Sequence, residues 1–306
     1  MENLIETKDL KKILSDCKKQ VKARKGKEGN SFLSSGRLSD LITNLCVMKT
    51  LGGGDLYIRV IGTKIEDDPY KDMEPLFTSP SPYVETSFFP QDMFDYWKPL
   101  LEAQPYVKSV NVYHGEEVTF NLDTYRYCYF NNEYLDKTQG ILLKALIETW
   151  GIKISFSKPW ITVDGDKDLD RKVLVARSIK YHGGDMNYNT MVKFLLDNSF
   201  FYGTDMEYMN FGACCCMLWR LKPDSALDLA ACLKSMELVF ANENFMYWLA
   251  IALGVKEIHY ELCPDLYYGI NDNQNVKYFL GNNYVFPADV SFNVKNTRKK
   301  KDVPAV

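Results

Sequence analysis

Between residues 31 and 60, the order of apolar and polar positions predicts a strand, a helix and a second strand. The apolar segment SFLSS at 31–35 is typical of a short strand, and Gly36 of a turn. From residue 37 to residue 51, apolar side chains recur at the spacing of one helix face, at Leu38, Leu41, Ile42, Leu45 and Met48. The segment DLYIRV at 55–60 reads as the next strand. The stretch therefore predicts a βαβ unit and a parallel sheet.

A glycine triplet at 52–54 follows this predicted helix. A dinucleotide-binding fingerprint has the order GxGxxG and opens a helix, so the triplet does not fit it. Because glycine tolerates positive φ angles, we interpret the triplet as the flexible end of the helix.

Strand and helix patterns alternate again beyond residue 172. Strands are expected at KVLVAR (172–177), SFFYG (199–203), ELVFA (237–241) and KEIHYEL (256–262). Helices are expected at NYNTMVKFLLD (187–197), DMEYMNF (205–211), DSALDLAACLKSM (224–236) and ENFMYWLAIALG (243–254). This rhythm predicts a second Rossmann-like α/β domain.

Two segments between these patterns differ in composition. Residues 63–95 are rich in proline, serine and acidic residues and are expected to form a long surface excursion, after which 96–113 resumes as helix, turn and strand. The Asp-rich stretch at 160–172 suits a solvated linker between domains. Alternatively, its DxD spelling at Asp164 and Asp166 fits a motif of metal-dependent sugar transferases.

The length of 306 residues and the apolar share of 46% allow one large core or two domains, and the two patterned halves favour two. The expected division is a basic segment (1–30), a Rossmann-like domain (31–163), an acidic linker (164–172), a Rossmann-like domain (173–290) and a basic tail (291–306). Neither a membrane-spanning apolar run nor a signal peptide is evident, so we expect a soluble, cytoplasmic protein.

The cysteines and the charge limit the possible chemistry. The eight cysteines form no CxxC pair and no histidine lies at zinc-like spacing, so we expect reduced core thiols and no metal site. Adjacent residues in a strand point to opposite faces and do not easily hold one ion together, so we interpret the run Cys214–Cys216 as structural, with metal or redox chemistry as the alternative. A net charge of -3 argues against a globally basic nucleic-acid binder. However, the basic runs at 18–27 and 298–301 are either solvated ends or contacts for a polyanion.

Ligands of open parallel sheets bind beyond the carboxyl ends of the strands. The three loops at these ends hold the candidate site residues, which are Ser34, Ser35, Gly36, Arg37 and Asp40 in the first loop, Arg177, Ser178, Lys180 and His182 in the second, and Asn242, Glu243 and Asn244 in the third. Asp40 either complements the helix dipole or accepts a proton from a hydroxyl. Arg177 and Lys180 either hold a diphosphate or belong to a solvated loop. The helix that begins near Asn244 can offer backbone N–H groups to a phosphate.

The order of several segments carries a family resemblance. SSGRLSDLITNL, LGGGDLYI and PLLEAQPYVKSV precede RSIKYHGGDMNY, FFYGTDMEYMNF and ALDLAACLKSMELVFANENFMYWLAIALGVKEIHYEL. In this order, over about residues 31–270, the chain resembles the GT-B fold glycosyltransferases related to bacterial heptosyltransferases, and especially their bacteriophage-type relatives.

The resemblance implies an α/β fold of two Rossmann-like domains that face a central cleft, the GT-B architecture. It implies that the N-terminal domain binds the acceptor, through Ser35, Gly36 and Arg37, and that Asp40 acts as the base. It further implies a nucleoside-diphosphate sugar as donor at Arg177, Ser178, Lys180 and Asn242–Asn244, with no obligatory metal and no further cofactor. Where the family has a Gly-Asp pair, this chain has Ser39-Asp40, and its loop Ala241–Asn244 also departs from the family pattern.

The expected function is the transfer of a hexose or pentose to a hydroxyl. With the basic ends, the phage-type resemblance makes a hydroxymethylated pyrimidine in DNA a plausible acceptor. A saccharide or lipid-linked sugar is the alternative acceptor. A second class of function is a nucleotide-sugar binder that has kept the fold and lost the chemistry.

Overall fold

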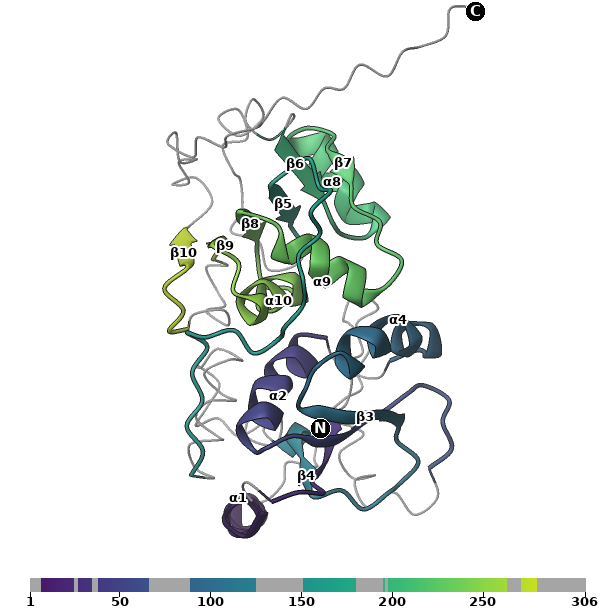
Figure 1. The fold of residues 1–306 in the computed structure, drawn as a ribbon, viewed down its shortest axis with the longest axis vertical. Helices are drawn as coiled ribbons and strands as arrows, with labels where there is room; N and C mark the ends of the chain where they lie inside the picture. Colours follow the sequence, from purple (N-terminus) through teal and green to yellow (C-terminus); the bar gives the residue numbers. More distant parts are fainter. Residues whose placement is uncertain are drawn as a thin grey trace, which may run out of the picture.

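The computed structural model describes residues 7–24, 27–34, 38–65, 89–124, 151–179, 195, 198–262 and 271–279. Within them the chain forms two parallel β-sheets, one in each half, which lie one above the other in Figure 1. The α/β class and the two Rossmann-like units predicted from the sequence are confirmed.

The sheet of the N-terminal half has the order β3-β2-β1-β4. Its strands are β1 (Ser31–Ser34), β2 (Gly54–Ile58), β3 (Val107–Val112) and β4 (Phe120–Asn121), all parallel. The helices of this half are α1 (Thr7–Arg24), α2 (Leu38–Thr50) and α4 (Gln91–Glu102), with a short 3₁₀ turn at Leu122–Thr124. Strand β1 is central and buried, because it pairs on both edges and α2 packs on it.

The sheet of the C-terminal half has the order β10-β9-β8-β5-β6-β7. Its parallel strands are β5 (Val173–Ala176), β6 (Ser199–Phe201), β7 (Trp219–Arg220), β8 (Leu238–Ala241), β9 (Glu257–Glu261) and β10 (Val276–Phe279). The helices are α8 (Asp205–Cys214), α9 (Ala226–Lys234) and α10 (Phe245–Leu253). If β5 is taken as the first strand, this is the strand order of a dinucleotide-binding Rossmann sheet. In such a sheet successive strands are added first on one side of the first strand and then on the other, so the order reverses between β5 and β8.

Helix α10 is apolar on all sides and lies between the two halves. Asn244 caps its start, and Gly254 ends it in the left-handed conformation (φ 69°). Every residue from Met246 to Leu253 is buried, as expected for a helix that is covered on all faces.

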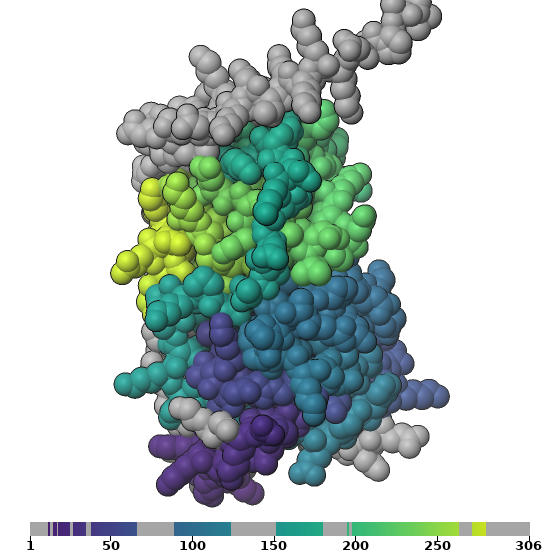
Figure 2. Space-filling model, viewed as in Figure 1, coloured from purple at the N-terminus to yellow at the C-terminus, as the bar shows by residue number. Residues whose placement is uncertain are grey.

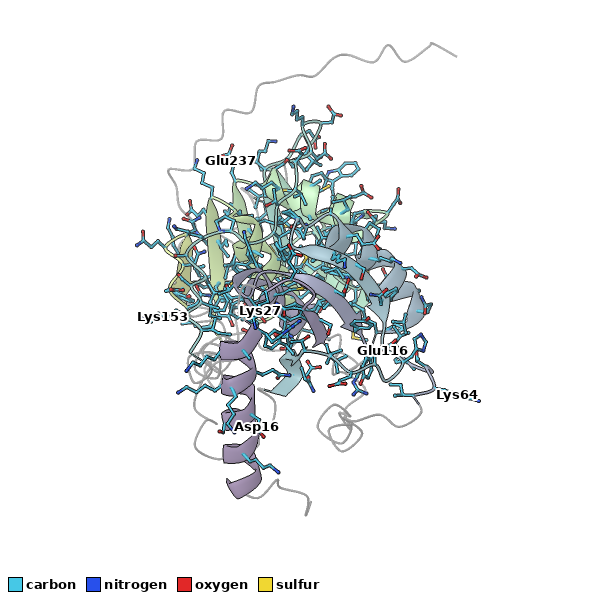
Figure 3. The ribbon with its side chains drawn as sticks, turned by 60° about the horizontal axis from the view of Figure 1, so that its bottom comes forward. Asp16, Lys27, Lys64, Glu116, Lys153 and Glu237 are labelled. Atoms are coloured by element: carbon cyan, nitrogen blue, oxygen red, sulfur yellow. The ribbon has the colours of Figure 1, made fainter. Side chains whose placement is uncertain are left out.

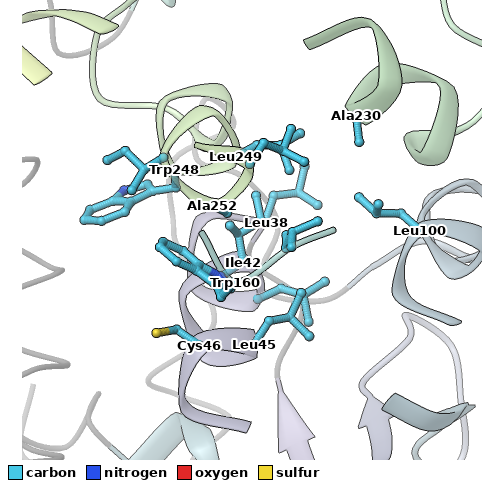
Figure 4. Packing of buried hydrophobic residues seen from close by; sticks show 14 of the residues in the cluster. Leu38, Ile42, Leu45, Cys46, Leu100, Trp160, Ala230, Trp248, Leu249 and Ala252 are labelled. Carbon is cyan, nitrogen blue, oxygen red and sulfur yellow. The ribbon is translucent and has the colours of Figure 1, made fainter. Parts of the chain in front are cut away.

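The two halves share one continuous hydrophobic core. Helix α10 packs on α2, and α9 packs on α4 (Figure 4). Trp160, which belongs to the connection between the halves, ties them together: its Nε1–H donates to the Ile42 carbonyl (2.7 Å) and its backbone N–H to the Ala252 carbonyl (2.9 Å). In the space-filling view, this connection runs along the surface from the lower half to the upper half, and the halves are in direct contact (Figure 2).

Several details differ from the sequence expectations. The surface excursion at 63–95 ends earlier than expected, because Phe89 already bridges to Val60 and α4 begins at Gln91. The strands β4, β7 and β10 were not predicted, since two to four residues carry little periodicity. The helix expected at 187–197 lies almost entirely outside the described residues. None of the described helices combines the length and the apolar character needed to cross a bilayer.

The interpretation of the glycine triplet is confirmed. Gly52 follows α2 with φ at 99°, and the Gly53 N–H donates to the Met48 carbonyl (3.0 Å). A Cβ on Gly53 would lie only 2.1 Å from the Tyr106 carbonyl oxygen. The triplet therefore ends the helix and lets the chain pass close to β3.

Candidate functional site

A cleft of about 1300 Å³ lies between the two halves. The first turns of α2 and α4 line it from the N-terminal half, and the segments that follow β5, β6, β7 and β8 line it from the C-terminal half. These segments leave the carboxyl ends of parallel strands, where α/β sheets bind their ligands. The predicted central cleft is therefore confirmed, and its position suits a ligand site.

Asn242 links the ends of β5 and β8, the two neighbouring strands between which the strand order of the C-terminal sheet reverses. Its Oδ1 accepts a hydrogen bond from the Ser178 N–H (2.8 Å), and its Nδ2 donates to the Ser178 carbonyl (2.8 Å). Asn242 is fully buried, whereas Ser178 lines the cleft. Both side-chain groups of Asn242 thus hold the loop after β5 to the loop after β8.

Asn244 fixes the start of α10 against the end of β5. Its Oδ1 accepts hydrogen bonds from the N–H groups of Met246 (2.9 Å) and Tyr247 (3.3 Å), and its Nδ2 donates to the Ala176 carbonyl (2.6 Å). These are N–H groups that an uncapped helix offers to an anion. The donor contacts predicted for Asn242 and Asn244 stay predictions, since both side chains already serve the fold.

Arg177 leaves the end of β5 and lines the cleft. Its Nε and Nη2 donate to the Glu261 carboxylate at 2.7 and 3.0 Å, and the two side chains are only 5% and 0% exposed. Glu261 ends β9, so the pair reaches across the end of β8, which lies between them. Glu261 thereby balances the charge of Arg177 inside the protein. Sequence reasoning missed Glu261, whose signal is a carboxylate at the end of the apolar strand KEIHYEL.

Glu243 places a carboxylate on the floor of the cleft. Its Oε2 accepts a hydrogen bond from the Tyr260 hydroxyl (2.5 Å), and its Oε1 accepts one from Trp248 Nε1 (3.3 Å). Both rings are fully buried, which fixes the direction of the carboxylate. Neither ring was predicted as part of the site.

Four aromatic rings connect the halves across the cleft. The ring of Trp97 in α4 meets that of Phe245 edge-on with centroids 5.8 Å apart, and Tyr202 after β6 meets Phe245 in the same way at 6.1 Å. Tyr96 lies beside Tyr202, and burial together with this neighbouring hydroxyl raises the pKa of Tyr96. Both tyrosines are therefore neutral hydrogen-bonding groups at physiological pH. Neither tyrosine was predicted as a site residue, because Tyr96 and Tyr202 are 106 positions apart in the sequence and only the fold brings them together.

The rim of the cleft at α8 and β7 carries charges of both signs. Thr204 and Glu207 form a capping box at the start of α8, with the Thr204 N–H donating to Glu207 Oε2 (2.8 Å). The Arg220 guanidinium binds Asp205 and lowers the pKa of that carboxyl group. Lys222 is exposed and forms no ion pair within the part of the chain that the structure describes. Lys222 is thus a cation that this rim can offer to a ligand.

Asp40 lies in the first turn of α2, beside the cleft. Its neighbours Leu38 and Ser39 line the cleft, and Asp40 itself is 1% exposed behind them. One turn later on the same helix face, Asn44 donates its Nδ2 to Ser34 Oγ (3.2 Å), which ties this face to the end of β1. The structure thus places Asp40 one residue from the cleft wall, and its role as base stays a prediction.

Two further buried charges lie at the same edge of the N-terminal sheet. Arg59 follows β2 and Asp123 follows β4, the two neighbours of β1, and both are at most 2% exposed. The Arg59 guanidinium lies 5.0 Å from the centroid of the Tyr113 ring. Sequence reasoning missed both, because Arg59 fell inside the strand expected at 55–60 and no strand was expected ahead of Asp123.

Several predicted site residues lie outside the described residues, namely Ser35, Gly36, Arg37, Lys180 and His182. The basic tail at 298–301 also lies outside them, whereas residues 18–24 of the basic N-terminal run belong to α1. Nothing more is assigned to these positions than the sequence predicts.

The sequence has two features that could indicate a metal site, the DxD at Asp164 and Asp166 and the cysteine run Cys214–Cys216. Among the described residues, no three or more His, Cys, Asp or Glu side chains are arranged to hold a metal ion. In the DxD, the Asp166 N–H donates to the Ala231 carbonyl (3.1 Å). The cysteine run lies at the end of a helix, because α8 extends to Cys214, and the sulfur atoms of Cys215 and Cys216 lie 3.6 Å apart.

Comparisons with known proteins add the following. No protein-family model matches the chain, and no curated protein matches its sequence. Among solved structures, it is similar to a glycosyl transferase family 9 protein from Veillonella parvula, with 11% identity over 84% of this chain and 87% of that one and a TM-score of 0.47. It is also similar to the ADP-heptose lipopolysaccharide heptosyltransferase II of E. coli, with 8% identity over 82% and 90% of the two chains and a TM-score of 0.49. Likenesses of this degree assign neither a family nor an activity.

Proposed function

We propose that the protein transfers a sugar from a nucleoside-diphosphate sugar, bound in the cleft, to a hydroxyl of an acceptor. One observation carries the proposal. The cleft lies where the strand order of the C-terminal Rossmann sheet reverses, and α2 and α4 of the N-terminal half line its opposite side. A two-sided cleft of this kind can hold a nucleotide on one sheet and present its sugar to an acceptor on the other.

The lining of the cleft supports a sugar as part of the ligand. Aromatic rings from both halves, including Tyr96 and Tyr202, offer faces and hydroxyl groups, and carboxylates from Asp92 and Glu243 offer hydrogen-bond acceptors. Sugars bind through apolar ring faces and through hydroxyl groups that donate to such acceptors. A mixed lining suits them better than a purely apolar pocket would.

In the proposed reaction the acceptor oxygen attacks the anomeric carbon of the donor sugar. The new C–O bond forms while the bond from that carbon to the diphosphate oxygen breaks, and the nucleoside diphosphate leaves with the bonding electrons. Asp40 takes the proton of the acceptor hydroxyl as the bond forms. We assign Lys222 and Arg220 at the rim, together with the sequence-predicted Lys180, to the negative charge of the leaving diphosphate. The proposed reaction needs no metal.

The substitution Asp40→Asn tests this assignment. It removes the proton acceptor and keeps the shape, so transfer should fall by about 10²–10⁴-fold while the affinity for the nucleoside diphosphate stays within about twofold. Asp123→Asn is the matched control, since Asp123 is equally buried at the same sheet edge but does not begin a helix that lines the cleft. Full turnover by Asp40→Asn would show that another group is the base.

For the acceptor we propose a hydroxymethylated pyrimidine in DNA. Helix α1 extends from the body of the molecule (Figure 3), and its side chains Lys18, Lys19 and Lys22 are exposed. Only Lys19 among them pairs with an acidic described residue, Asp16. Basic side chains on a protruding helix can bind phosphates, and such binding weakens steeply with salt.

Reversing the charge of basic side chains on α1 tests whether DNA or a sugar is the acceptor. Lys18→Glu with Lys22→Glu should weaken binding to duplex DNA and flatten its salt dependence, without changing nucleotide binding in the distant cleft. Salt-insensitive or absent DNA binding by the natural protein would favour the alternative, a saccharide or lipid-linked sugar acceptor.

One observation favours a second candidate function, a nucleotide-sugar binder without catalysis. The charge of Arg177 is balanced by Glu261, and the side-chain amides of Asn242 and Asn244 form hydrogen bonds within the protein. Few of the described polar groups at the ends of β5 and β8 therefore remain for a diphosphate. Nucleotide-sugar hydrolysis and transfer to a pool of acceptors decide between the two. Binding with neither reaction would establish the second candidate.

A further inference from the structure

We infer that Glu243 binds hydroxyl groups of the donor sugar and so determines which sugar the cleft accepts, while the phosphates lie away from it. This inference rests on the proposed function, because it assigns one part of the proposed donor to one part of the cleft. It changes the role expected for the loop 242–244 from phosphate binding to sugar selection.

The position of the Glu243 carboxylate is fixed by its neighbours. The Tyr260 hydroxyl and the Trp248 indole N–H each hold one of its oxygens, and Glu243 is only 8% exposed yet lines the cleft. The Tyr260 ring is itself held by the Tyr247 ring, with centroids 4.2 Å apart. An ionised carboxylate offers about four lone-pair sites on its two oxygens, more than the Tyr260 and Trp248 donors use, so a ligand hydroxyl can also donate to it.

The charge around Glu243 disfavours a phosphate. Among the residues that the structure describes, Arg177 at the end of β5 already forms two hydrogen bonds with Glu261, and Asn244 occupies N–H groups at the start of α10. A phosphate beside Glu243 would therefore meet a carboxylate of like charge in a site shielded from water. A sugar hydroxyl, by contrast, donates a hydrogen bond to an ionised acceptor, which is among the stronger kinds of hydrogen bond.

The arrangement of the cleft agrees with this division. Leu38 and Ser39, at the start of the helix that carries the proposed base, line the same cleft as Glu243. The exposed cation Lys222 follows β7, which is separated from β8 by β5 and β6. A donor whose sugar contacts Glu243 would thus keep its anomeric carbon near α2 and direct its phosphates along the sheet towards Lys222.

The test compares the affinities of the full-length protein for paired ligands by isothermal titration calorimetry. The pairs are UDP-glucose with UDP and ADP-glucose with ADP, which differ only in the glucosyl group. Glu243→Gln should weaken binding of the nucleotide sugar by about tenfold and leave the affinity for the nucleoside diphosphate unchanged or slightly higher. Glu237→Gln is the matched control, because Glu237 directly precedes β8 at the opposite end of the same strand (Figure 3) and should change neither affinity.

A second variant covers the case in which Glu243→Gln fails to fold. Tyr260→Phe keeps the ring contacts and removes the hydroxyl that orients Glu243, so it should weaken nucleotide-sugar binding selectively but less strongly. Equal losses for the nucleotide sugar and the nucleoside diphosphate would overturn the inference and place a ribose or phosphate at Glu243. If the natural protein bound neither member of either pair, the proposed donor would itself be wrong.

Discussion

At the scale of single residues, the charges near the cleft floor are held in specific pairs. Arg177 and Glu261 form two hydrogen bonds and are almost completely buried. An ion pair of this kind adds little net stability relative to apolar residues of similar volume, but removal of one partner leaves a buried charge unpaired.

Glu261→Gln should therefore lower the free energy of unfolding by about 3 kcal/mol, measured by urea denaturation. The double variant Arg177→Met with Glu261→Met should be less destabilised than Glu261→Gln alone, because it buries no unpaired charge. Asp170→Asn, which removes a partner of Arg171 at a 69% exposed side chain, is the surface control and should cost less than about 1 kcal/mol. A double variant at least as destabilised as the single one would show that the pair itself stabilises the fold.

The same residues show why only half of this site could be predicted. Arg177 and Asn242 could be placed because each directly follows a strand with a clear apolar pattern. Their partners depend on strand order: Glu261 meets Arg177 over 84 positions of the sequence, across the end of an intervening strand. A pattern of neighbouring residues cannot predict a contact between residues that are so far apart in the sequence. For the same reason, the sequence alone did not show that Asn244 would be used to cap α10 and bind Ala176.

At the scale of elements, long periodic segments were predictable and short ones were not. The patterns for α2, α9 and α10 predicted those helices within a few residues, because each buries a broad apolar face. Two-residue strands such as β4 and β7 exist only because a neighbouring strand pairs with them. The start of α4 was set too late because its first turn is acidic and follows a proline, which resembles a loop.

The turn after α2 allows a sharp test of what a glycine does in it. Gly53 and Gly62 both have positive φ, at 76° and 82°, but only Gly53 has backbone atoms where a Cβ would stand. Gly62→Ala should cost about 1–2 kcal/mol of unfolding free energy, the usual cost of the left-handed conformation. Gly53→Ala should cost clearly more, because its Cβ would also collide with the Tyr106 carbonyl. Equal losses in urea denaturation would mean that the chain moves aside without cost.

At the scale of the whole molecule, the two sheets behave as one structural body in their packing. The hydrophobic cluster that contains residues of α2 and α4 also contains residues of α9 and α10, so it continues from one half into the other (Figure 4). Two domains joined only by a linker would instead expose a polar interface and unfold separately. The structure has one sheet in each half, while the hydrophobic core continues across both, and the domain boundaries expected from the sequence stay a prediction.

We therefore expect one unfolding transition for both halves. Scanning calorimetry should give equal calorimetric and van't Hoff enthalpies, and hydrogen exchange in β2 and β8 should lose protection together. Trp160→Ala removes the buried ring that packs in the shared core and donates its indole N–H to Ile42, but it keeps the backbone N–H bond to Ala252, so it should cost about 3–5 kcal/mol and still leave a single transition. Trp219→Ala is the matched control, because that ring is 63% exposed and its loss should change the stability by less than about 1 kcal/mol. Two resolved transitions, or exchange lost in only one sheet, would contradict the shared core. A single transition would mean that the packing that stabilises the fold also holds the walls of the cleft. Ligands would then enter a cleft whose width is fixed by the core before they bind.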